Sequence, residues 1–373
     1  MKLFYIYTHD LSNPSIGVFN KIEQQANCFR QAGFDVEKVN MFREKSLQER
    51  VINRITFFGN TSNYKNIICD FATVKNSVIY IRFALFDFYA WKLFKMCRKN
   101  NNFIVIEIPT YPFKKEINFR SKQFYFQHLF YLKLVRNYIS FFVTYSEDNK
   151  IYSIDSVPIT NGIDLSLYSV KTKCIFKNEL HLLVVATLAI WHGVDRVIKG
   201  LGIYVHKGGN EKVYLHVVGE GDELKRLKEM VTTEGLEEYV FFYGTLKGKE
   251  LDDLFDKMHL GVGSLGCHRI NIYSASILKS REYCARALPF FISVKLSDFP
   301  DNFKYVKYIP ADESPVNVDE IIAFAHAVYL NIDMQEEMRS WAEKNLSWER
   351  KMLPVIQRIK GGLENQGVWN IQE

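Results

Sequence analysis

The chain lacks both a long apolar run and a recognisable leader. No stretch of its 373 residues approaches the roughly 20 consecutive apolar residues that cross a bilayer. Residues 1–10 have neither the basic start nor the small-residue cleavage site of a signal peptide. These absences predict a cytoplasmic protein, either freely diffusing or peripheral at the inner face of the cell membrane.

Paired cysteines and metal-ligand spacings are also absent. The six cysteines include no CxxC pair, and the nine histidines form no HExxH motif. Zinc sites and disulfide frameworks depend on such spacings. We therefore predict buried free thiols, and chemistry that needs no bound metal or other resident cofactor.

The charge of the chain is positive but uneven. The net charge is +6, and residues 1–165 hold 22 Lys and Arg against 14 Asp and Glu, so the remainder is slightly acidic. A basic, aromatic half suits anionic lipid headgroups or nucleic acid, and an ordinary solvated surface explains it equally well. Charge alone does not favour a nucleic-acid partner.

The first half alternates short apolar runs with stretches of helical periodicity. This alternation predicts a parallel sheet covered on both faces, and such sheets bind ligands at the carboxyl ends of their strands. The predicted strands are 2–8, 35–42, 77–83, 103–109 and 139–145. We expect ligand contacts from the loop around Gly17, which precedes a helix, and from Thr110, Tyr111 and Glu116. An ordinary tight turn is the alternative at Gly17.

One helical stretch, 119–142, is dense in aromatic residues with interspersed Lys and Arg. Such a helix can lie in a membrane interface. Its apolar residues also suit a helix that is packed on two sides, and that interpretation is favoured.

The second half repeats the alternation after a predicted linker at 166–179. The predicted strands are 182–187, 213–219, 240–244, 260–265 and 290–293, with helices at 194–206, 222–234, 247–257 and 276–287. Two doubly wound domains joined by one linker predict a cleft between their facing strand ends.

Two motifs in this half match known patterns poorly. Gly261, Gly263 and Gly266 spell GxGxxG, but no helix opens directly after them as a dinucleotide site requires. Ser276 and Lys279 spell SxxK, but neither SDN nor KTG follows, which argues against a serine acylase.

The stretch 276–289, SILKSREYCARALP, carries the clearest polar pattern. If it is one helix, Ser276, Lys279 and Glu282 project from the same face. This graded stripe of hydroxyl, cation and carboxylate predicts a polar partner against the helix.

The order of these motifs resembles retaining glycosyltransferases of GT-B architecture, family 4 type, in the subgroup of capsule and exopolysaccharide biosynthesis. LKSREYCARALPF resembles the LKxxEYxAxGxP stretch of that subgroup, and WHGVDRVI is similar to the KGxDxLI segment. VVGEGDELKRL and VFFYGTL resemble two further signatures, NGID resembles the domain-closing turn, and IGVFNKIEQQANCFRQAGFDV resembles the N-terminal glycine loop and helix.

The resemblance implies an α/β fold of two Rossmann-like domains facing a cleft. The first domain would be 1–165, on the acceptor side, with a terminal helix at about 345–373 packing back on it. The second, 178–344, would bind the nucleotide-sugar. The implied reaction moves a sugar, from UDP-sugar in preference to GDP-sugar, to a glycan or lipid-linked glycan with retention of configuration.

The resemblance also assigns site residues in the second domain. Glu282 would hold the ribose hydroxyls, while Lys279, His192 and Arg196 would meet the diphosphate. Ser274 stands where the family has a first glutamate, and Thr187 and His192 stand where it has a basic pair. The full donor-binding set is Thr187, Gly193, Arg196, Gly219, Gly244, Thr245, Leu246, Ser274 and Ser276, and Lys279, Glu282 and His192 are the catalytic candidates.

Two other functions remain open at this stage. A GT-B nucleotide-sugar 2-epimerase would share the fold and the donor. A lapsed partner subunit that only binds nucleotide or glycan is suggested by Ser274 and the missing basic pair.

Overall fold

The computed structural model describes residues 1–9, 16–55, 62–109, 111, 122–172, 178–365 and 367. The chain divides into two compact units, one formed by 1–160 with 351–373 and the other by 161–350. The first unit thus ends before the predicted limit at 165.

The first unit is built on a seven-stranded sheet. All of its pairings are parallel except that of the short edge strand β6, and every predicted strand is present. In the order β2-β1-β3-β4-β5-β7-β6, the strands are Asp35–Asn40, Lys2–Tyr7, Val78–Arg82, Phe103–Ile108, Phe141–Thr144, Ile154–Pro158 and Lys150–Ile151. The central strands β4 and β5 are buried along their whole length and β3 is buried except at Arg82, as the apolar runs predict.

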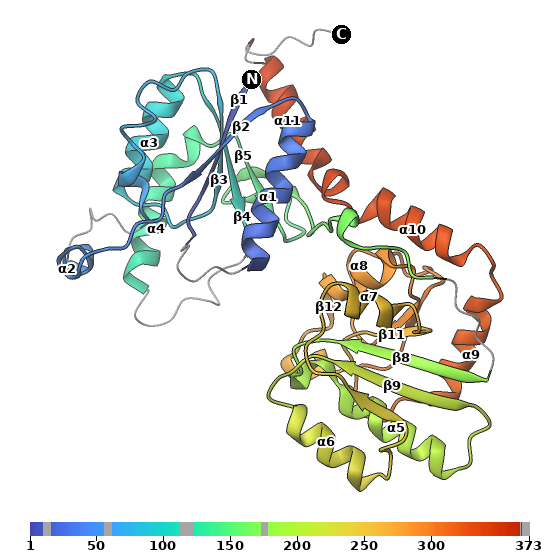
Figure 1. The fold of residues 1–373 in the computed structure, drawn as a ribbon. Helices are drawn as coiled ribbons and strands as arrows, with labels where there is room; N and C mark the ends of the chain where they lie inside the picture. The colour runs from blue at the N-terminus through green and yellow to red at the C-terminus, as the bar shows by residue number, and fades with distance from the viewer. Residues whose placement is uncertain are drawn as a thin grey trace. The chain divides into compact units, whose positions relative to one another are not determined.

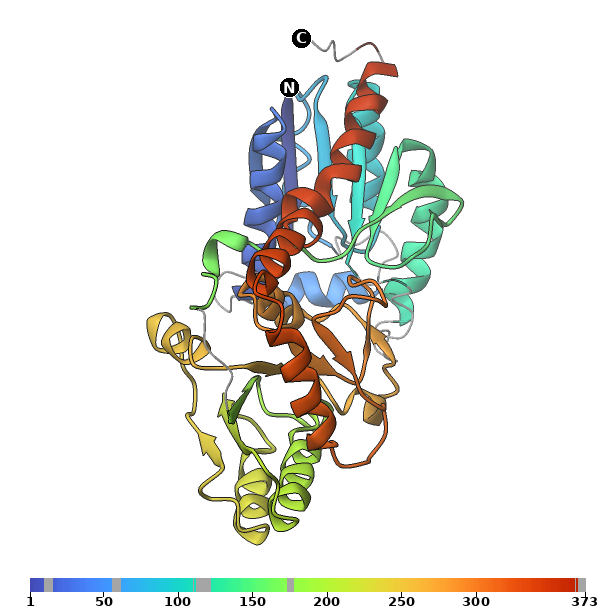
Figure 2. The ribbon, with the colours of Figure 1, turned by 90° about the vertical axis from the view of Figure 1, so that its right-hand side faces the viewer.

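Helices cover both faces of this sheet (Figure 1), with α1 and α11 on one side and α3 and α4 on the other. The helices are α1 Ile16–Gln31, α2 Leu47–Ile55, α3 Phe88–Lys99, α4 Lys122–Val135 and α11 Trp348–Asn365, with short 3-10 turns η1 Tyr64–Asn66 and η4 Arg136–Tyr138. Figure 2 shows the C-terminal part of α11 running along the strands. Its Met352 is buried and its sulfur accepts a hydrogen bond from Gln25 of α1.

The prediction that Gly17 lies in a loop before the first helix is wrong. Gly17 lies inside the first turn of α1, because the helix already begins at Ile16. Thr110 and Glu116 lie outside the described residues.

The second unit is built on a six-stranded parallel sheet. In the order β10-β9-β8-β11-β13-β15, the strands are Val240–Phe242, Lys212–Val218, Glu179–Val185, Leu260–Val262, Phe290–Ile292 and Val306–Tyr308. Two short strands, β12 Ser274–Ala275 and β14 Lys295–Leu296, pair separately. The five predicted strands are present, and β12, β14 and β15 were missed.

The helices of the second unit lie on both sides of its sheet, with α5 and α6 on one face (Figure 1). They are α5 Val194–His206, α6 Leu224–Thr233, α7 Lys249–Phe255, α8 Leu278–Ala285, α9 Val318–Tyr329 and α10 Met334–Asn345, with 3-10 turns η5 Leu165–Leu167, η6 Ile190–His192 and η7 Cys267–Ile270. Within the described ranges, no helix combines the length and apolarity needed to cross a bilayer.

The described part of the predicted linker, 166–172, is tied to the second unit by hydrogen bonds. Lys171 donates its backbone N–H to the carbonyl of Arg286 at 3.0 Å. Arg339 donates to the carbonyl of Tyr168 at 2.8 Å. Residues 161–172 therefore belong to the second unit.

The cysteines match their prediction with one exception. Cys28, Cys97, Cys267 and Cys284 are buried, whereas Cys69 is exposed. Cys174 lies outside the described residues.

Candidate functional site

The predicted donor residues gather at one edge of the second sheet. Val185 pairs with Val218, and Val217 pairs with Phe242, so β8, β9 and β10 end side by side. The loops that follow carry Thr187, Gly219 and Gly244. Because parallel strands bring their carboxyl ends to a common edge, residues from distant parts of the sequence meet there.

Gly219 connects two of these loops. Its N–H donates to the carbonyl of Gly244 at 2.7 Å, and a Cβ on Gly219 would lie 1.9 Å from the carbonyl oxygen of Ala186. Its φ of 121° is also one that L-residues rarely adopt. Thr245 is exposed and Leu246 packs partly against the core.

His192 is held by backbone contacts on both sides. Its carbonyl accepts from the N–H of Leu265 at 3.0 Å, and Trp191 accepts from Gly266 at 3.1 Å. Gly193 has φ 62°, and a Cβ there would lie 2.7 Å from the nitrogen of Gly266. Only glycine therefore lets η6 approach the loop after β11 so closely.

The Lys279 ammonium lies against the His192 ring. Lys279 Nζ is 3.0 Å from His192 Nδ1, and Ser264 Oγ is 3.2 Å from the same nitrogen. Burial lowers the pKa of Lys279 to about 7. Burial, and secondarily the charge of Lys279, lowers the pKa of His192 to about 3, so the imidazole is neutral and its Nδ1 can accept.

Glu282 lies one turn further along α8. Its Oε1 accepts from Arg286 Nε at 3.0 Å, and Arg286 also forms an ion pair with Asp252 at 2.7 Å. Burial raises the pKa of Glu282, while the guanidinium of Arg286 opposes that effect. Among the described residues, hydrogen bonds and ion pairs reach only Oε1 of Glu282, so Oε2 is available to a ligand.

Ser276 does not belong to the same helix face. α8 begins at Leu278, so Ser276 precedes the helix. Its Oγ donates to Asp298 at 2.9 Å and accepts from Arg281, and Arg281 and Asp298 form a buried ion pair. The predicted three-residue stripe therefore reduces to Lys279 and Glu282, because the Ser276 hydroxyl is engaged by Asp298.

Ser274 is exposed in β12, where it pairs with Lys295 of β14. Its hydroxyl stands where the sequence resemblance led us to expect a carboxylate, and among the described residues no acidic side chain contacts Ser274 in its place.

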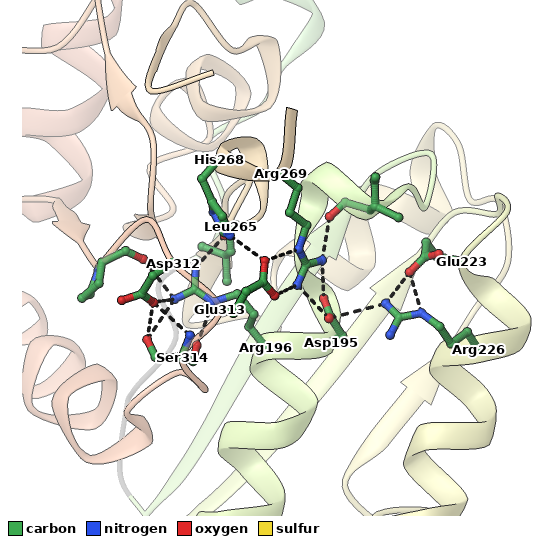
Figure 3. A network of polar contacts seen from close by, with 12 residues as sticks. Asp195, Arg196, Glu223, Arg226, Leu265, His268, Arg269, Asp312, Glu313 and Ser314 are labelled. Carbon is green, nitrogen blue, oxygen red and sulfur yellow. Dashed lines mark hydrogen bonds and ion pairs between the residues drawn. The ribbon is translucent and has the colours of Figure 1, made fainter. Parts of the chain in front are cut away.

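The prediction that Arg196 meets the diphosphate is wrong. Arg196 is 1% exposed, and its guanidinium donates to the carbonyls of Ser314, Leu265 and Pro310 at 2.6–3.0 Å (Figure 3). A side chain whose three nitrogens are bound by protein oxygens stabilises loops and cannot also hold a ligand.

A second arginine, Arg269, belongs to the same network and lies in no sequence motif. Arg269 of η7 holds both oxygens of Asp195 at 2.9–3.0 Å, contacts Glu313, and donates to the carbonyl of Ile190 at 2.9 Å (Figure 3). Burial alone would raise the pKa of Asp195, but Arg269 and Arg226 hold it below its usual value. Through Ile190, this network fixes the turn that carries His192.

The glycines of the GxGxxG stretch allow neighbouring side chains to pack closely against the backbone. A Cβ on Gly261 would meet the ring of Tyr283 at 2.6 Å, and one on Gly263 would meet Ile292 at 2.7 Å. In the described part of the chain, no group of three or more His, Cys, Asp or Glu is placed to hold a metal ion.

Comparison with known proteins places this geometry in context. Residues 170–262 match the family described as "Glycosyl transferases group 1". A glycosyltransferase of Rickettsia africae, solved as a crystal structure, superposes with a TM-score of 0.61 at 14% identity, over 96% of this chain and 98% of that one. Anabaena HepE in complex with UDP superposes with a TM-score of 0.59 at 12% identity, over 98% of this chain and 100% of that one.

The chain has the GT-B fold. Its sequence is also 30% identical over 148 residues to an uncharacterized glycosyltransferase of Methanocaldococcus jannaschii. That alignment covers 36% of this chain and 38% of the relative, so it spans well under half of the relative's length.

Four residues were predicted for the acceptor side of this GT-B chain, and the structure describes two of them, Gly17 and Tyr111. The ring of Tyr111 packs edge-on against Tyr152 with centroids 6.1 Å apart, and burial raises the pKa of the Tyr111 hydroxyl.

The sequence patterns did not identify a buried carboxylate near the carboxyl end of β4 in the first unit. Glu107 of β4 is fully buried, and it accepts from the Tyr80 hydroxyl at 2.7 Å and from Arg82 at 2.5 Å. Burial would raise the pKa of Glu107, but Arg82 and Lys21 hold it below its usual value. A single Glu in the apolar run FIVIEI is the signal that identifies it.

Proposed function

We propose that this protein is a glycosyltransferase that uses a nucleotide-diphosphate sugar, UDP-sugar in preference to GDP-sugar. The acceptor is a glycan or lipid-linked glycan, transfer retains the anomeric configuration, and the product belongs to capsule or exopolysaccharide assembly. The observation that carries this proposal is the placement of Lys279 against His192, with Glu282 one turn away, at the carboxyl edge of the second sheet. The UDP named for the HepE complex supports the choice of base.

The phosphate side of the site consists of Lys279 and the start of α8. The first N–H groups of a helix lack intrahelical partners and favour anions. Neutral His192 accepts from Lys279 and so directs the ammonium without adding charge. A charge-assisted hydrogen bond of this kind contributes about 1.5–3 kcal/mol.

The ribose side is Glu282. An ionised carboxylate accepts from two adjacent hydroxyls, which suits the 2′ and 3′ positions of a ribose. Arg286 opposes the effect of burial on the pKa of Glu282 and favours the ionised form.

Catalysis in this proposal is positioning and stabilisation of the leaving diphosphate. Lys279 holds the charge that develops as the glycosidic bond to phosphate breaks. The leaving diphosphate accepts the acceptor's proton, so no protein nucleophile is required.

The first experiment is a thermal-shift panel of UDP, GDP, ADP and UMP, followed by calorimetry. UDP is expected to raise the melting temperature, because a ligand that binds only the folded state stabilises it. Absence of stabilisation by every diphosphate would contradict the donor site. Hydrolysis of a UDP-sugar above background would further exclude a lapsed subunit.

Glu282→Gln is expected to weaken UDP binding by about tenfold, as loss of a charged hydrogen-bond acceptor implies. The assignment to ribose is tested with 2′-deoxy-UDP in calorimetry. Wild-type protein should bind 2′-deoxy-UDP less tightly than UDP, and the variant should bind the two nearly equally. Glu229→Gln, on the exposed surface of α6, is the control and should behave as wild type. An unchanged preference for UDP in Glu282→Gln would refute the assignment.

UDP affinity is expected to fall as the pH rises from 7 to 9, by up to about tenfold per unit. In the free protein Lys279 titrates at about 7, so above that pH it is mostly neutral. A bound diphosphate favours the protonated form of Lys279. UDP binding above pH 7 is therefore coupled to the uptake of a proton by Lys279, and the affinity falls as the pH rises. Calorimetry in buffers of different ionisation enthalpy measures this uptake. Lys279→Arg keeps the charge at every pH and should flatten the profile.

A further inference from the structure

Helix α4 of the first unit has two contrasting faces. Gln127, His128, Tyr131, Leu132 and Val135 are buried against the domain. Phe126, Phe130 and Leu134 recur at four-residue intervals and are 65%, 48% and 41% exposed. The sequence favoured a helix packed on two sides, but the structure leaves one apolar face of α4 in contact with solvent.

A groove runs beside this exposed face. Its volume is about 490 Å³, and its lining includes Phe126, Leu129, Phe130 and Tyr152. Lys133 and Arg136 border it and are exposed. A volume of this size accommodates part of a lipid chain, and its apolar lining suits one.

Tyr152 enters the groove from an unusual backbone position. Tyr152 and Ser153 form the two-residue turn between β6 and β7, with φ values of 50° and 66°. Hairpin turns of this geometry favour Asn and Gly, so a tyrosine there costs conformational energy. Its ring packs edge-on against Tyr111 and lies near His128, which extends the aromatic surface of the groove.

The charged side chains that line the groove, Lys133 and Arg136, are both cations. Residues 122–138, which comprise α4 and η4, contain three Lys and Arg and no Asp or Glu. A stretch of exposed aromatics flanked by cations is the composition of protein surfaces that bind anionic lipid.

We propose that the face of α4 formed by Phe126, Phe130, Leu134, Lys133 and Arg136 docks the protein on an anionic lipid bilayer. Phe126 and Phe130 enter the headgroup region, and the two cations contact lipid phosphates. A second copy of the chain fits this surface less well, because a two-fold contact would bring Lys133 and Arg136 near their own copies. The inference does not rest on the proposed glycosyltransferase activity.

The test is co-sedimentation with vesicles of phosphatidylglycerol and phosphatidylcholine, compared with phosphatidylcholine alone. The 373-residue chain is expected to bind the anionic vesicles at least tenfold more tightly than phosphatidylcholine vesicles, and 0.5 M salt should weaken that binding. Phe126→Ser/Phe130→Ser and Lys133→Gln/Arg136→Gln should each reduce binding by about tenfold or more.

Matched controls lie on the second unit. Leu330→Ser/Ile332→Ser removes two large aliphatic side chains that are 84% and 80% exposed, and Lys225→Gln removes an exposed cation. Both should bind vesicles as wild type does. Equal binding of the α4 variants and wild type would overturn the proposal, as would failure to bind anionic vesicles. A concentration-dependent dimer abolished by Phe126→Ser/Phe130→Ser would assign the face to a second copy. UDP calorimetry on the same variants reports separately on the donor site.

Discussion

Replacing Lys279 by methionine is expected to weaken UDP binding strongly and at the same time to stabilise the protein. The loss of affinity is expected to reach about 100-fold, since Lys279 is the second residue of α8 and a charge-assisted contact with phosphate contributes up to about 3 kcal/mol. Methionine keeps most of the length and apolar volume of lysine, so packing around His192 should persist.

The gain in stability follows from the direction of the pKa shift. Burial lowers the pKa of Lys279 to about 7, while the unfolded chain holds it near 10.5. Between these pH values Lys279 is protonated in the unfolded chain and mostly neutral in the folded protein. Folding must therefore release this proton, which lowers the free energy of unfolding. The free energy of unfolding rises as the pH rises through this range. Removing the lysine eliminates this cost, which at pH 7.5 is on the order of 1–2 kcal/mol after allowance for solvent screening.

Calorimetric titration with UDP and urea unfolding at several pH values test both halves of this prediction. Lys212→Met removes an exposed lysine with 68% of its side chain in solvent, and it should change neither quantity. A destabilised Lys279→Met variant would mean that the ammonium is held by favourable contacts in the folded protein. Tight UDP binding by that variant would remove Lys279 from the site.

Local patterns were sufficient for most of the sheet and helix assignments. The mainly apolar runs of β3, β4 and β8 indicate strands buried on both faces, and the helical period of 194–206 predicts α5 at its observed bounds. Such features depend on neighbouring residues alone, so the sequence reveals them directly.

The start of α8 could not be predicted in the same way. Spacing places Ser276, Lys279 and Glu282 on one helix face, but the helix begins only at Leu278. The Ser276 hydroxyl is instead bound by Asp298, which lies 22 residues later in the chain. A long-range hydrogen bond of this kind leaves no periodic signal.

The roles of the arginines also depended on tertiary contacts. Arg196 lies just after the WHGVD stretch and was predicted to meet the diphosphate, yet its guanidinium is bound by the loop 310–314. Arg269 carries no motif, but it ties Asp195 to the turn of His192. Residue type indicated a charged network here, and only the fold distinguished ligand contacts from loop contacts.

The buried ion pair beside Ser276 leads to the largest expected effect on stability. Arg281 and Asp298 are both almost fully buried, with 0% and 1% of their side chains exposed. Arg281→Met leaves the Asp298 carboxylate without this partner, and breaking a buried pair in this way costs about 3–5 kcal/mol. The midpoint of thermal unfolding should fall by about 10 °C, on the scale of 2–4 °C per kcal/mol for a unit of this size.

The double variant Arg281→Met/Asp298→Leu separates the unpaired charge from the loss of packing. Replacing both partners by apolar groups removes the buried charge, so calorimetry should show most of the lost stability restored. Ser276→Ala, which removes only the hydroxyl, should cost about 1 kcal/mol and leave the dissociation constant for UDP unchanged. If Ser276→Ala instead weakened UDP binding tenfold with its melting temperature intact, the hydroxyl would be a ligand contact, and the assignment of Ser276 to the Arg281–Asp298 pair would be wrong.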